Sequence, residues 1–420
     1  MLSLILICIF AIVFGTISYF KPVWGVYIIG AGLPSFLLRA KVFDVPFTFL
    51  EVMILLLFVI CLFKKQIDFK KIYRNYFFWP IVAILFFATV SLFVSPKIIS
   101  GAGIWKAYFI EPILFWAIIV SLLRTKKQLE RLFWALGISV LYLGALAIGQ
   151  KFTGWGVPQA FMRVDGSVDR VVSILKYPNA LGLYIGPIIV LFLGWLIAGI
   201  KNYYSVILKI SVIVVGFIAI ILAQSEAAVG AVVIACFILL ILYKKTRISF
   251  LILGTVAVMT VLLLPEVREF VLTKVFLQDY SGMIRRIMWK ETWKMLQYRW
   301  LFGAGLSGYQ YYIYPYHLDT FEIYPYPHQI IFNFWSELGL GGLIAFIWLF
   351  IKYFWKNITA IFKNPGVKIM AITYICIGLQ IIIHGLVDAP YFKNDLAVLF
   401  WIIIASAGIN ASLFSLHKDS

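Results

Sequence analysis

Long stretches of apolar residues recur along this chain and restrict what it can fold into. Each approaches the roughly 20 residues that an α-helix needs to cross a bilayer. The chain contains thirteen such stretches, or twelve if the first two form a partial hairpin. They cover residues 2–20, 22–38, 46–63, 77–95, 104–123, 132–150, 178–199, 204–223, 226–243, 248–265, 327–351, 369–388 and 394–413. The sequence therefore predicts an all-α, polytopic transmembrane bundle that forms one integral membrane domain over residues 1–420.

The overall composition excludes an ordinary soluble protein. Of the 420 residues, 63% are hydrophobic and only 13% are charged. A soluble domain of this length needs more charge to cover its surface. The N-terminal apolar stretch has no basic segment before it and no small-residue cleavage site, so we expect it to be a first helix and not a signal peptide. All four cysteines fall within predicted spans and are expected to be small apolar packing residues.

Lysines and arginines in the short connections predict the orientation. Short cytoplasmic loops carry an excess of these residues. Four connections are basic, and alternating spans place all four on one face. They contain Lys64, Lys65, Lys70, Lys71 and Arg74; Arg124, Lys126, Lys127 and Arg131; Lys244, Lys245 and Arg247; and Lys352, Lys356, Lys363 and Lys368. We expect that face to be the cytoplasmic side of a bacterial inner membrane.

The two longest connections, 151–177 and 266–326, then fall on the outer side. Both loops are basic even though they lie outside. This does not contradict the predicted orientation, because long loops do not follow the charge rule. Their cations include Lys151, Arg163, Arg170 and Lys176 in the first loop, and Arg268, Lys274, Arg285, Arg286, Lys290, Lys294 and Arg299 in the second. An excess of cations on an external loop favours an anionic partner such as a lipid phosphate.

The second loop contains a predicted amphipathic helix. Arg286, Lys290 and Lys294 recur every four residues, beside apolar positions that include Trp289 and Trp293. Such a helix lies in the membrane interface, where its lysines either contact phosphate or only extend toward lipid headgroups. Arg285 and Arg286 are better candidates for binding a diphosphate, because a guanidinium group can hold phosphate oxygens in a bidentate manner.

A glycine-rich segment, 303–308, and a series of tyrosines follow this helix. No strand precedes the glycines, so a dinucleotide site is not expected and a flexible turn is the better interpretation. The tyrosines can stack on sugars, but tyrosine is also common at membrane interfaces.

Four polar residues near the outer ends of the last spans are candidates for chemistry. His328 lies where the second loop re-enters the membrane and could act as a general base or as an interfacial hydrogen-bonding residue. Glu337 lies deeper, where a carboxylate needs a partner or a role. His384 and Asp388 are one helical turn apart. Two ligands make a poor metal site, so we expect them to form a hydrogen-bonded pair that supports the site.

The order of these motifs resembles the O-antigen ligase and O-antigen polymerase superfamily over about residues 165–400. The motifs are Arg170-x-x-Ser173-x-x-x-x-Pro178-Asn179, Arg285-Arg286 with Trp289, Gly303-x-Gly305, His328-Gln329, Glu337-Leu338-Gly339 and His384-x-x-x-Asp388. The resemblance implies a glycosyltransferase of the GT-C type. Such enzymes move a glycan from an undecaprenyl-diphosphate carrier to an acceptor hydroxyl on the periplasmic side, with inversion and with no metal or other cofactor.

The resemblance also implies roles for individual residues. His328 matches the family's loop histidine, and Arg285 or Arg286 matches its phosphate-binding arginine. The family often has Ser-Arg where this chain has Ser225-Glu226, so Arg170 or Lys176 is expected to replace that arginine. In the family, the loop histidine is usually followed by Asn. In this chain, Gln329 occupies that position.

Several functions remain open at this point. The acceptor could be a lipid A-core sugar, another carrier-linked repeat, or a protein Ser or Thr, which correspond to a ligase, a polymerase and a protein O-oligosaccharyltransferase. A lipid or polysaccharide flippase would have a similar number of spans. Transporters commonly show inverted repeats and charges at mid-membrane. No internal repeat is evident here and the polar residues gather outside, so the enzyme is favoured.

Overall fold

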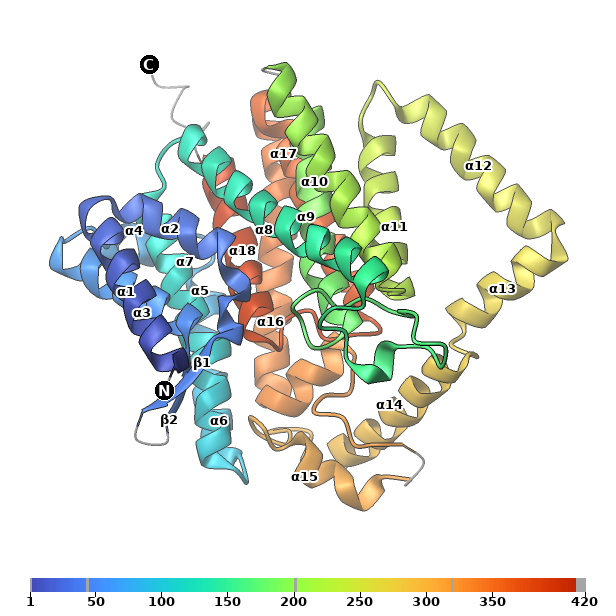
Figure 1. The fold of residues 1–420 in the computed structure, drawn as a ribbon, viewed down its shortest axis with the longest axis horizontal. Coiled ribbons are helices and arrows are strands. Elements are labelled where there is room, and N and C mark those ends of the chain that lie inside the picture. Colours follow the sequence, from blue (N-terminus) through green and yellow to red (C-terminus); the bar gives the residue numbers. More distant parts are fainter. Residues whose placement is uncertain (1, 43–44, 200–201, 319–320, 413–420) are drawn as a thin grey trace.

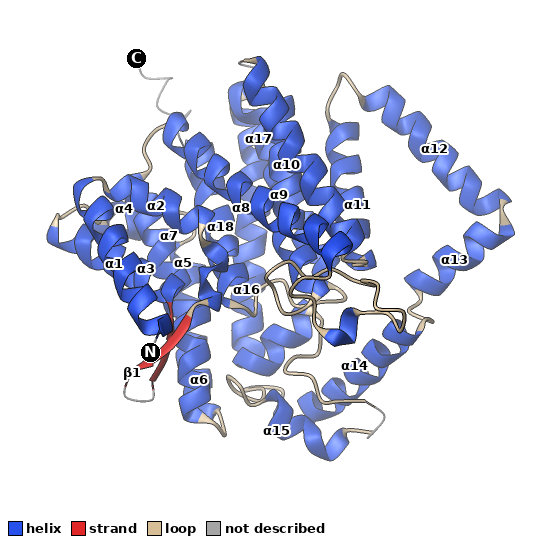
Figure 2. Cartoon of the chain, viewed as in Figure 1, coloured by secondary structure: helices blue, strands red, loops and turns tan. Residues whose placement is uncertain are grey.

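A computed structural model describes residues 2–42, 45–199, 202–318 and 321–412. Nearly all of this structure is helical (Figures 1 and 2). Within the described residues, the strands form a single antiparallel hairpin of β1 (Arg39–Val42) and β2 (Val45–Thr48). The predicted all-α membrane bundle is therefore confirmed.

The helices follow one another along the chain with short connections, apart from the two long loops. The first half contains α1 (Leu2–Phe20), α2 (Pro22–Ala31), η1 (Leu33–Leu37), α3 (Phe49–Phe63), α4 (Phe69–Tyr73), α5 (Phe78–Val94), α6 (Ile98–Ile104), the π-helix η2 (Trp105–Ile110), α7 (Glu111–Leu122), α8 (Lys126–Thr153) and η3 (Gln159–Phe161). The second half contains α9 (Pro178–Ile197), α10 (Tyr203–Leu222), α11 (Glu226–Leu242), α12 (Arg247–Leu263), α13 (Pro265–Val275), α14 (Tyr280–Arg299), α15 (Tyr309–Ile313), η4 (Tyr314–Tyr316), α16 (Ile330–Lys363), η5 (Pro365–Val367), α17 (Lys368–Gly385) and α18 (Asn394–Ser412).

Seven helical segments of the described chain are long and apolar enough to cross a membrane, or eight if α12 and the bent segment that follows it to Arg299 count as one span. Five further apolar helices are shorter. The predicted stretch 22–38 shows why: α2 ends at Ala31, and the 3₁₀ turn η1, which includes Pro34, follows it. A helix of ten residues is about 15 Å long, roughly half of the hydrocarbon thickness. The first two stretches thus correspond to the partial hairpin.

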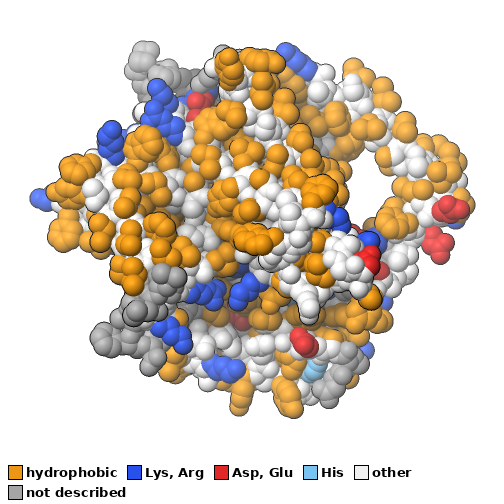
Figure 3. Space-filling view, in the orientation of Figure 1, with side chains coloured by type: hydrophobic (Ala, Val, Ile, Leu, Met, Phe, Trp, Pro, Cys, Tyr) orange, Lys and Arg blue, Asp and Glu red, His pale blue; other side chains and the backbone are white. Residues whose placement is uncertain are grey.

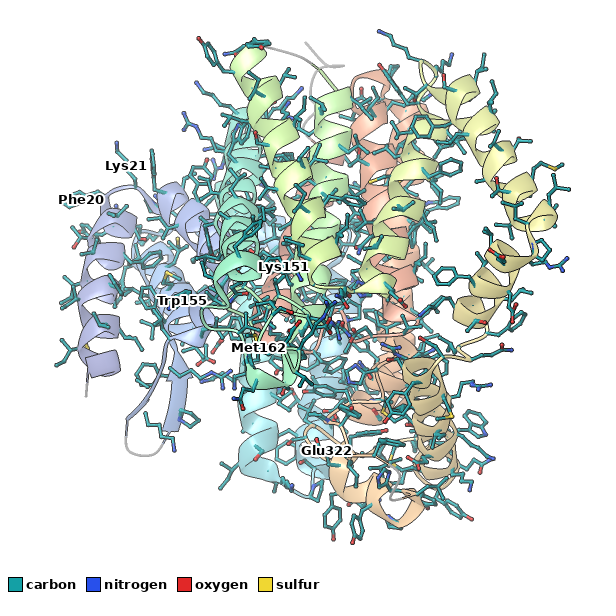
Figure 4. All side chains as sticks on the ribbon, turned by 45° about the vertical axis from the view of Figure 1, so that its right-hand side comes forward. Phe20, Lys21, Lys151, Trp155, Met162 and Glu322 are labelled. Atoms are coloured by element: carbon teal, nitrogen blue, oxygen red, sulfur yellow. The ribbon has the colours of Figure 1, made fainter. Side chains whose placement is uncertain are left out.

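The two ends of the bundle differ. The connections α7–α8, α11–α12 and α16–α17 lie at its upper end in Figure 1, whereas α14 and α15 lie at its lower end. Figure 4 shows the same division, with Phe20 and Lys21 high in the view and Glu322 at the bottom. Apolar side chains cover much of the surface between the two ends (Figure 3). This is the surface expected of a multi-pass membrane protein.

The longest helix, α16, is broken at Gly339. Its backbone there has φ 72° and ψ −179°, a conformation that only glycine adopts readily. A Cβ at this position would lie 2.3 Å from the carbonyl oxygen of Leu301. The break separates a short first segment, which carries Glu337, from the long membrane segment that follows.

The α12–α13 arm leaves the bundle. Neither helix has a buried residue, and the axes before and after the break at Leu264 and Pro265 differ by 99°. A proline at the start of α13 is compatible with a new helix but not with continuation of the old one. Figure 3 shows an opening between this arm and the bundle that side chains do not fill.

Candidate active site

His328 is held by a carboxylate from the loop between α17 and α18. Its Nδ1 lies 3.0 Å from Oδ1 of Asp388, and the same oxygen accepts the backbone N–H of Ala389 at 2.8 Å. Asp388 is buried, whereas the His328 side chain remains 30% exposed. Because an ionised carboxylate can only accept, Nδ1 carries the proton and Nε2 has its lone pair available. The backbone of His328 is in the left-handed region, with φ 46°.

The surroundings of Asp388 keep it ionised. Burial acts to raise the pKa of this carboxyl group. The hydrogen bond from His328, the charges of His328 and His384, and the Ala389 N–H outweigh burial and hold the pKa below its usual range. A negative charge therefore lies beside the imidazole of His328.

Arg285 reaches the same loop from α14. Its Nε donates to the carbonyl oxygen of Val387 at 2.9 Å, next to Asp388 in the chain. One turn later, Trp289 Nε1 donates to the carbonyl oxygen of Pro327 at 3.0 Å, next to His328. Two side chains of one helix thus fix both segments that meet at the His328–Asp388 pair. The guanidinium group of Arg285 and the imidazole of His328 thus bind to adjacent residues, Val387 and Asp388.

The predicted amphipathic helix is present as α14, and its two faces are distinct. Its buried residues are Gly282, Met288, Glu291, Thr292, Met295 and Leu296. The predicted basic stripe of Arg286, Lys290 and Lys294 is exposed. Arg285 is half-buried and points to the bundle, so the structure separates the two neighbouring arginines that the sequence left equivalent.

Arg170 occupies a second cationic position close by. Its guanidinium group donates to the carbonyl oxygen of Ala223 at 3.0 Å and to Oδ1 of Asn179 at 2.9 Å. Burial lowers the pKa of Arg170, the negative charges of Asp169 and Glu226 raise it, and the positive charge of Arg285 lowers it again. The two arginines are therefore near enough to interact electrostatically.

The acidic residue Glu226 is paired with a lysine that the sequence pattern did not indicate. Lys274 Nζ lies 2.6 Å from Glu226 Oε2 and 3.0 Å from Asp279 Oδ2. This contact joins the start of α11 to the end of α13 across the arm. Lys274 thus places a cation next to Glu226, the position where the resemblance predicts an arginine. Lys176, the other predicted replacement, is exposed on the first long loop.

The glycine-rich segment is not the flexible turn that we expected. Residues 303–306 are buried, and Gly303 and Gly305 have positive φ angles. The segment passes between α16 and the end of α5, where a Cβ on Gly305 would lie 2.7 Å from the backbone N of Ser95. The glycines are therefore explained by close packing.

Glu337 binds this segment. Its Oε2 accepts the backbone N–H of Ser307 at 2.9 Å, and the Ser91 hydroxyl donates to its carbonyl oxygen. Its Oε1 is buried with no hydrogen-bond partner among the described residues. Glu337 thus has the partner that a buried carboxylate requires, and this partner is backbone.

The predicted hydrogen bond between His384 and Asp388 is absent. Both ring nitrogens of His384 are buried with no hydrogen-bond partner in the described structure. His384 lines a small cavity of about 10 Å³, close to the space that a single water requires. Asp388 lies beyond the end of α17, and its Oδ1 bonds to His328 instead.

A second histidine–carboxylate pair was not predicted. His317 Nδ1 lies 3.3 Å from Glu291 Oε2, and Glu291 Oε1 accepts the backbone N–H of Leu318 at 2.9 Å. Both side chains are buried. The pair attaches the tyrosine-rich segment to the inner face of α14. A lone Glu within the amphipathic pattern, at a position otherwise apolar, was the available sequence signal.

Comparison with known families gives one match. A family model described as O-antigen ligase matches residues 211–347, which include α14, the glycine-rich segment, His328 and Glu337. No curated protein matches the chain. The match covers the core of the predicted resemblance and leaves Arg170, His384 and Asp388 outside it. Over residues 211–347, the chain is thus similar to the O-antigen ligase family, as the order of its motifs predicted.

Proposed function

We propose that this protein transfers a glycan from an undecaprenyl-diphosphate carrier to an acceptor hydroxyl on the periplasmic side of the inner membrane. One observation carries the proposal: consecutive residues, Val387 and Asp388, hold the guanidinium group of Arg285 and the imidazole of His328. This arrangement supports the proposal, because transfer from a glycosyl diphosphate requires a cation for the diphosphate and a general base for the acceptor close together.

In the proposed reaction, Nε2 of His328 takes the proton of the acceptor hydroxyl as its oxygen attacks the anomeric carbon. The bond between that carbon and the phosphate oxygen breaks, and its electron pair leaves with the diphosphate. Arg285 and Arg170 stabilise this charge as it develops. Asp388 stabilises the imidazolium. Attack opposite to the leaving group inverts the anomeric centre. The step uses groups of the chain alone, so no metal or other cofactor is proposed.

The roles of the other predicted cations are more peripheral. Arg286 faces away from the bundle on α14, and Lys176 is exposed on the first long loop. We propose that they attract the anionic donor instead of contacting its leaving oxygen. Glu337 and His384 are proposed as supports of the loops around the site.

The opening between the bundle and the α12–α13 arm suits a lipid-linked donor. An undecaprenyl chain must remain in hydrocarbon while its diphosphate reaches the site. The arm has no buried residue, and the Glu226–Lys274 ion pair lies between its end and the start of α11. We propose that the lipid chain enters between α11 and α12 and that the diphosphate passes toward Arg170 and Arg285.

The test is reconstitution in vesicles with a carrier-linked glycan and candidate acceptors, with release of undecaprenyl diphosphate as the readout. The variant His328→Gln can still donate a hydrogen bond to Asp388 but cannot take up a proton. We expect it to insert and fold normally and to release no product above background. Turnover at the wild-type rate would exclude His328 as the base.

Product analysis distinguishes the acceptors. A polymerase yields a ladder of repeats, a ligase transfers preformed chains once, and a protein O-oligosaccharyltransferase modifies Ser or Thr. A flippase would translocate the lipid-linked glycan without releasing its diphosphate, so the same assay separates transfer from transport.

A further inference from the structure

A second charged cavity lies at the end of the bundle opposite to the candidate active site. It has a volume of about 580 Å³ and lies where α4 meets the far ends of α16 and α18. Four cations line it, Lys70, Lys71, Arg74 and Lys356, together with a single carboxylate, Asp68. Four of these five charged residues come from the 68–74 segment, and the fold brings Lys356 to them from the far end of α16. A general bias of charge toward one face of the membrane does not by itself require such convergence.

The carboxylate in this cavity does not neutralise the cations. Asp68 Oδ1 accepts the backbone N–H of Lys71 at 2.9 Å and thereby caps α4. Lys71 donates to the carbonyl oxygen of Val120, and Lys356 Nζ lies 5.4 Å from the centre of the Tyr76 ring. No ion-pair partner is present for these four cations within the described residues. The cavity therefore has room and charge for an anion.

The position of the cavity relative to the membrane indicates the kind of anion. Tyr73, Phe78 and Trp79 form an aromatic cluster beside it, with ring centres 5.2 Å and 6.4 Å apart. Tyr73 and Trp79 are largely exposed. Exposed aromatic clusters of this kind occur at the level of lipid headgroups. Below them, α5 exposes Val82 and Phe86, where acyl chains would run.

We propose that this cavity binds the phosphodiester headgroup of an anionic phospholipid from the leaflet at this end, which the charge rule assigns to the cytoplasm. The phosphate would lie between the end of α16 and the 68–77 segment. Basic pockets between transmembrane helices on the cytoplasmic side have the charge and depth that such headgroups need. The site joins the N-terminal helices to the helix that carries Glu337, and it is independent of the proposed transfer reaction.

The test uses the full-length protein in nanodiscs that contain a zwitterionic lipid and a small fraction of phosphatidylglycerol. Lipids that remain bound after transfer to detergent are counted by native mass spectrometry. The variant Lys70→Gln/Arg74→Gln removes two exposed cations of the cavity and leaves Lys71, which bonds to α7, in place. The matched control Lys244→Gln/Lys245→Gln removes the same charge from the same end, outside the cavity.

We expect the wild type and the control to retain phosphatidylglycerol in preference to the zwitterionic lipid. We expect the cavity variant to bind it roughly thirtyfold more weakly, because each of the two cations removed contributes about 1 kcal/mol near an anionic lipid. Equal retention by the cavity variant and the control would overturn the proposal. Displacement of the lipid by millimolar inorganic phosphate would also overturn it, in favour of a soluble phosphate ligand.

Discussion

Both faces of α14 carry cations, but in different surroundings. On the inner face, Arg285, Trp289 and Glu291 each bond to a separate loop segment. On the outer face, Arg286 and Lys290 are exposed. A charge held by a hydrogen bond is already oriented when the reaction begins, whereas an exposed charge on a long side chain must be ordered at an entropic cost. The loss of activity when a cation of α14 is removed should therefore depend on which face of the helix carries it.

The largest effect is expected at Asp388, whose neighbour Val387 is bound by Arg285 from the inner face of α14. Asp388→Asn should lower turnover by about 10³–10⁴-fold with little change in the KM for the donor, because an amide can donate to Nδ1 and stabilise the wrong tautomer of His328. Steady-state kinetics in vesicles checks the prediction. Asp388→Glu, which restores the acceptor, should recover part of the activity and the wild-type pH profile. A variant Asp388→Asn with normal turnover would show that the carboxylate is only structural.

The neighbouring arginines give the sharpest comparison of the two faces. Arg285→Gln should lower turnover by about 10²–10³-fold, the usual loss on removal of a charge-stabilising donor. Arg286→Gln should lower it by no more than about fivefold, as expected for an exposed cation that only attracts the donor. Higher salt should reduce the effect of the second substitution but not of the first. Equal losses in the two variants would refute the distinction between the faces.

The break in α16 should affect stability more than chemistry. Gly339→Ala places a side chain at positive φ against the Leu301 carbonyl and should lower the free energy of unfolding by about 1–3 kcal/mol. Thermal unfolding in detergent measures this change. Gly199→Ala, where a Cβ meets nothing within 4 Å, is the matched control and should be close to neutral. A neutral Gly339→Ala would show that the helix is not constrained at this point.

The smallest effect concerns pH. The pKa of Asp388 is lower in the folded protein than in the unfolded chain, so its contribution to stability is complete above the unfolded pKa of about 4. That contribution decreases as the pH falls toward the folded pKa. Between pH 6 and pH 3, the unfolding temperature of the wild type should therefore decrease more than that of Asp388→Asn. Parallel curves for the two proteins would contradict the lowered pKa.

The sequence was sufficient for features that depend on local patterns. Long apolar stretches predicted the membrane helices, and the spacing of apolar and basic residues predicted α14. Periodicity could not separate Arg285 from Arg286, because adjacent residues on a helix lie about 100° apart and only packing shows which one faces inward. It also could not find the partner of Asp388, since His328 is 60 residues earlier in the chain.

Glycine patterns were ambiguous for a related reason. Glycines allow a flexible turn, but they also allow close backbone packing, and the segment 303–308 uses the second property. The distinction depends on Ser95, just after α5, and on Glu337 in α16, which flank the segment in space but not in sequence. The acidic residue Glu226 was likewise unexplained until the fold brought Lys274 to it.

The α12–α13 arm has a consequence for how the protein responds to its membrane. Near its start, α12 contacts α11 through Phe250 and Phe237, and no residue farther along either helix of the arm is buried. Acyl chains and not protein side chains then surround most of the arm. Its tilt should follow the hydrocarbon thickness, since a helix adjusts its angle to match the bilayer. Lipid chain length would in this way set the width of the opening between the arm and the bundle and, if the proposed donor enters there, the rate of its entry.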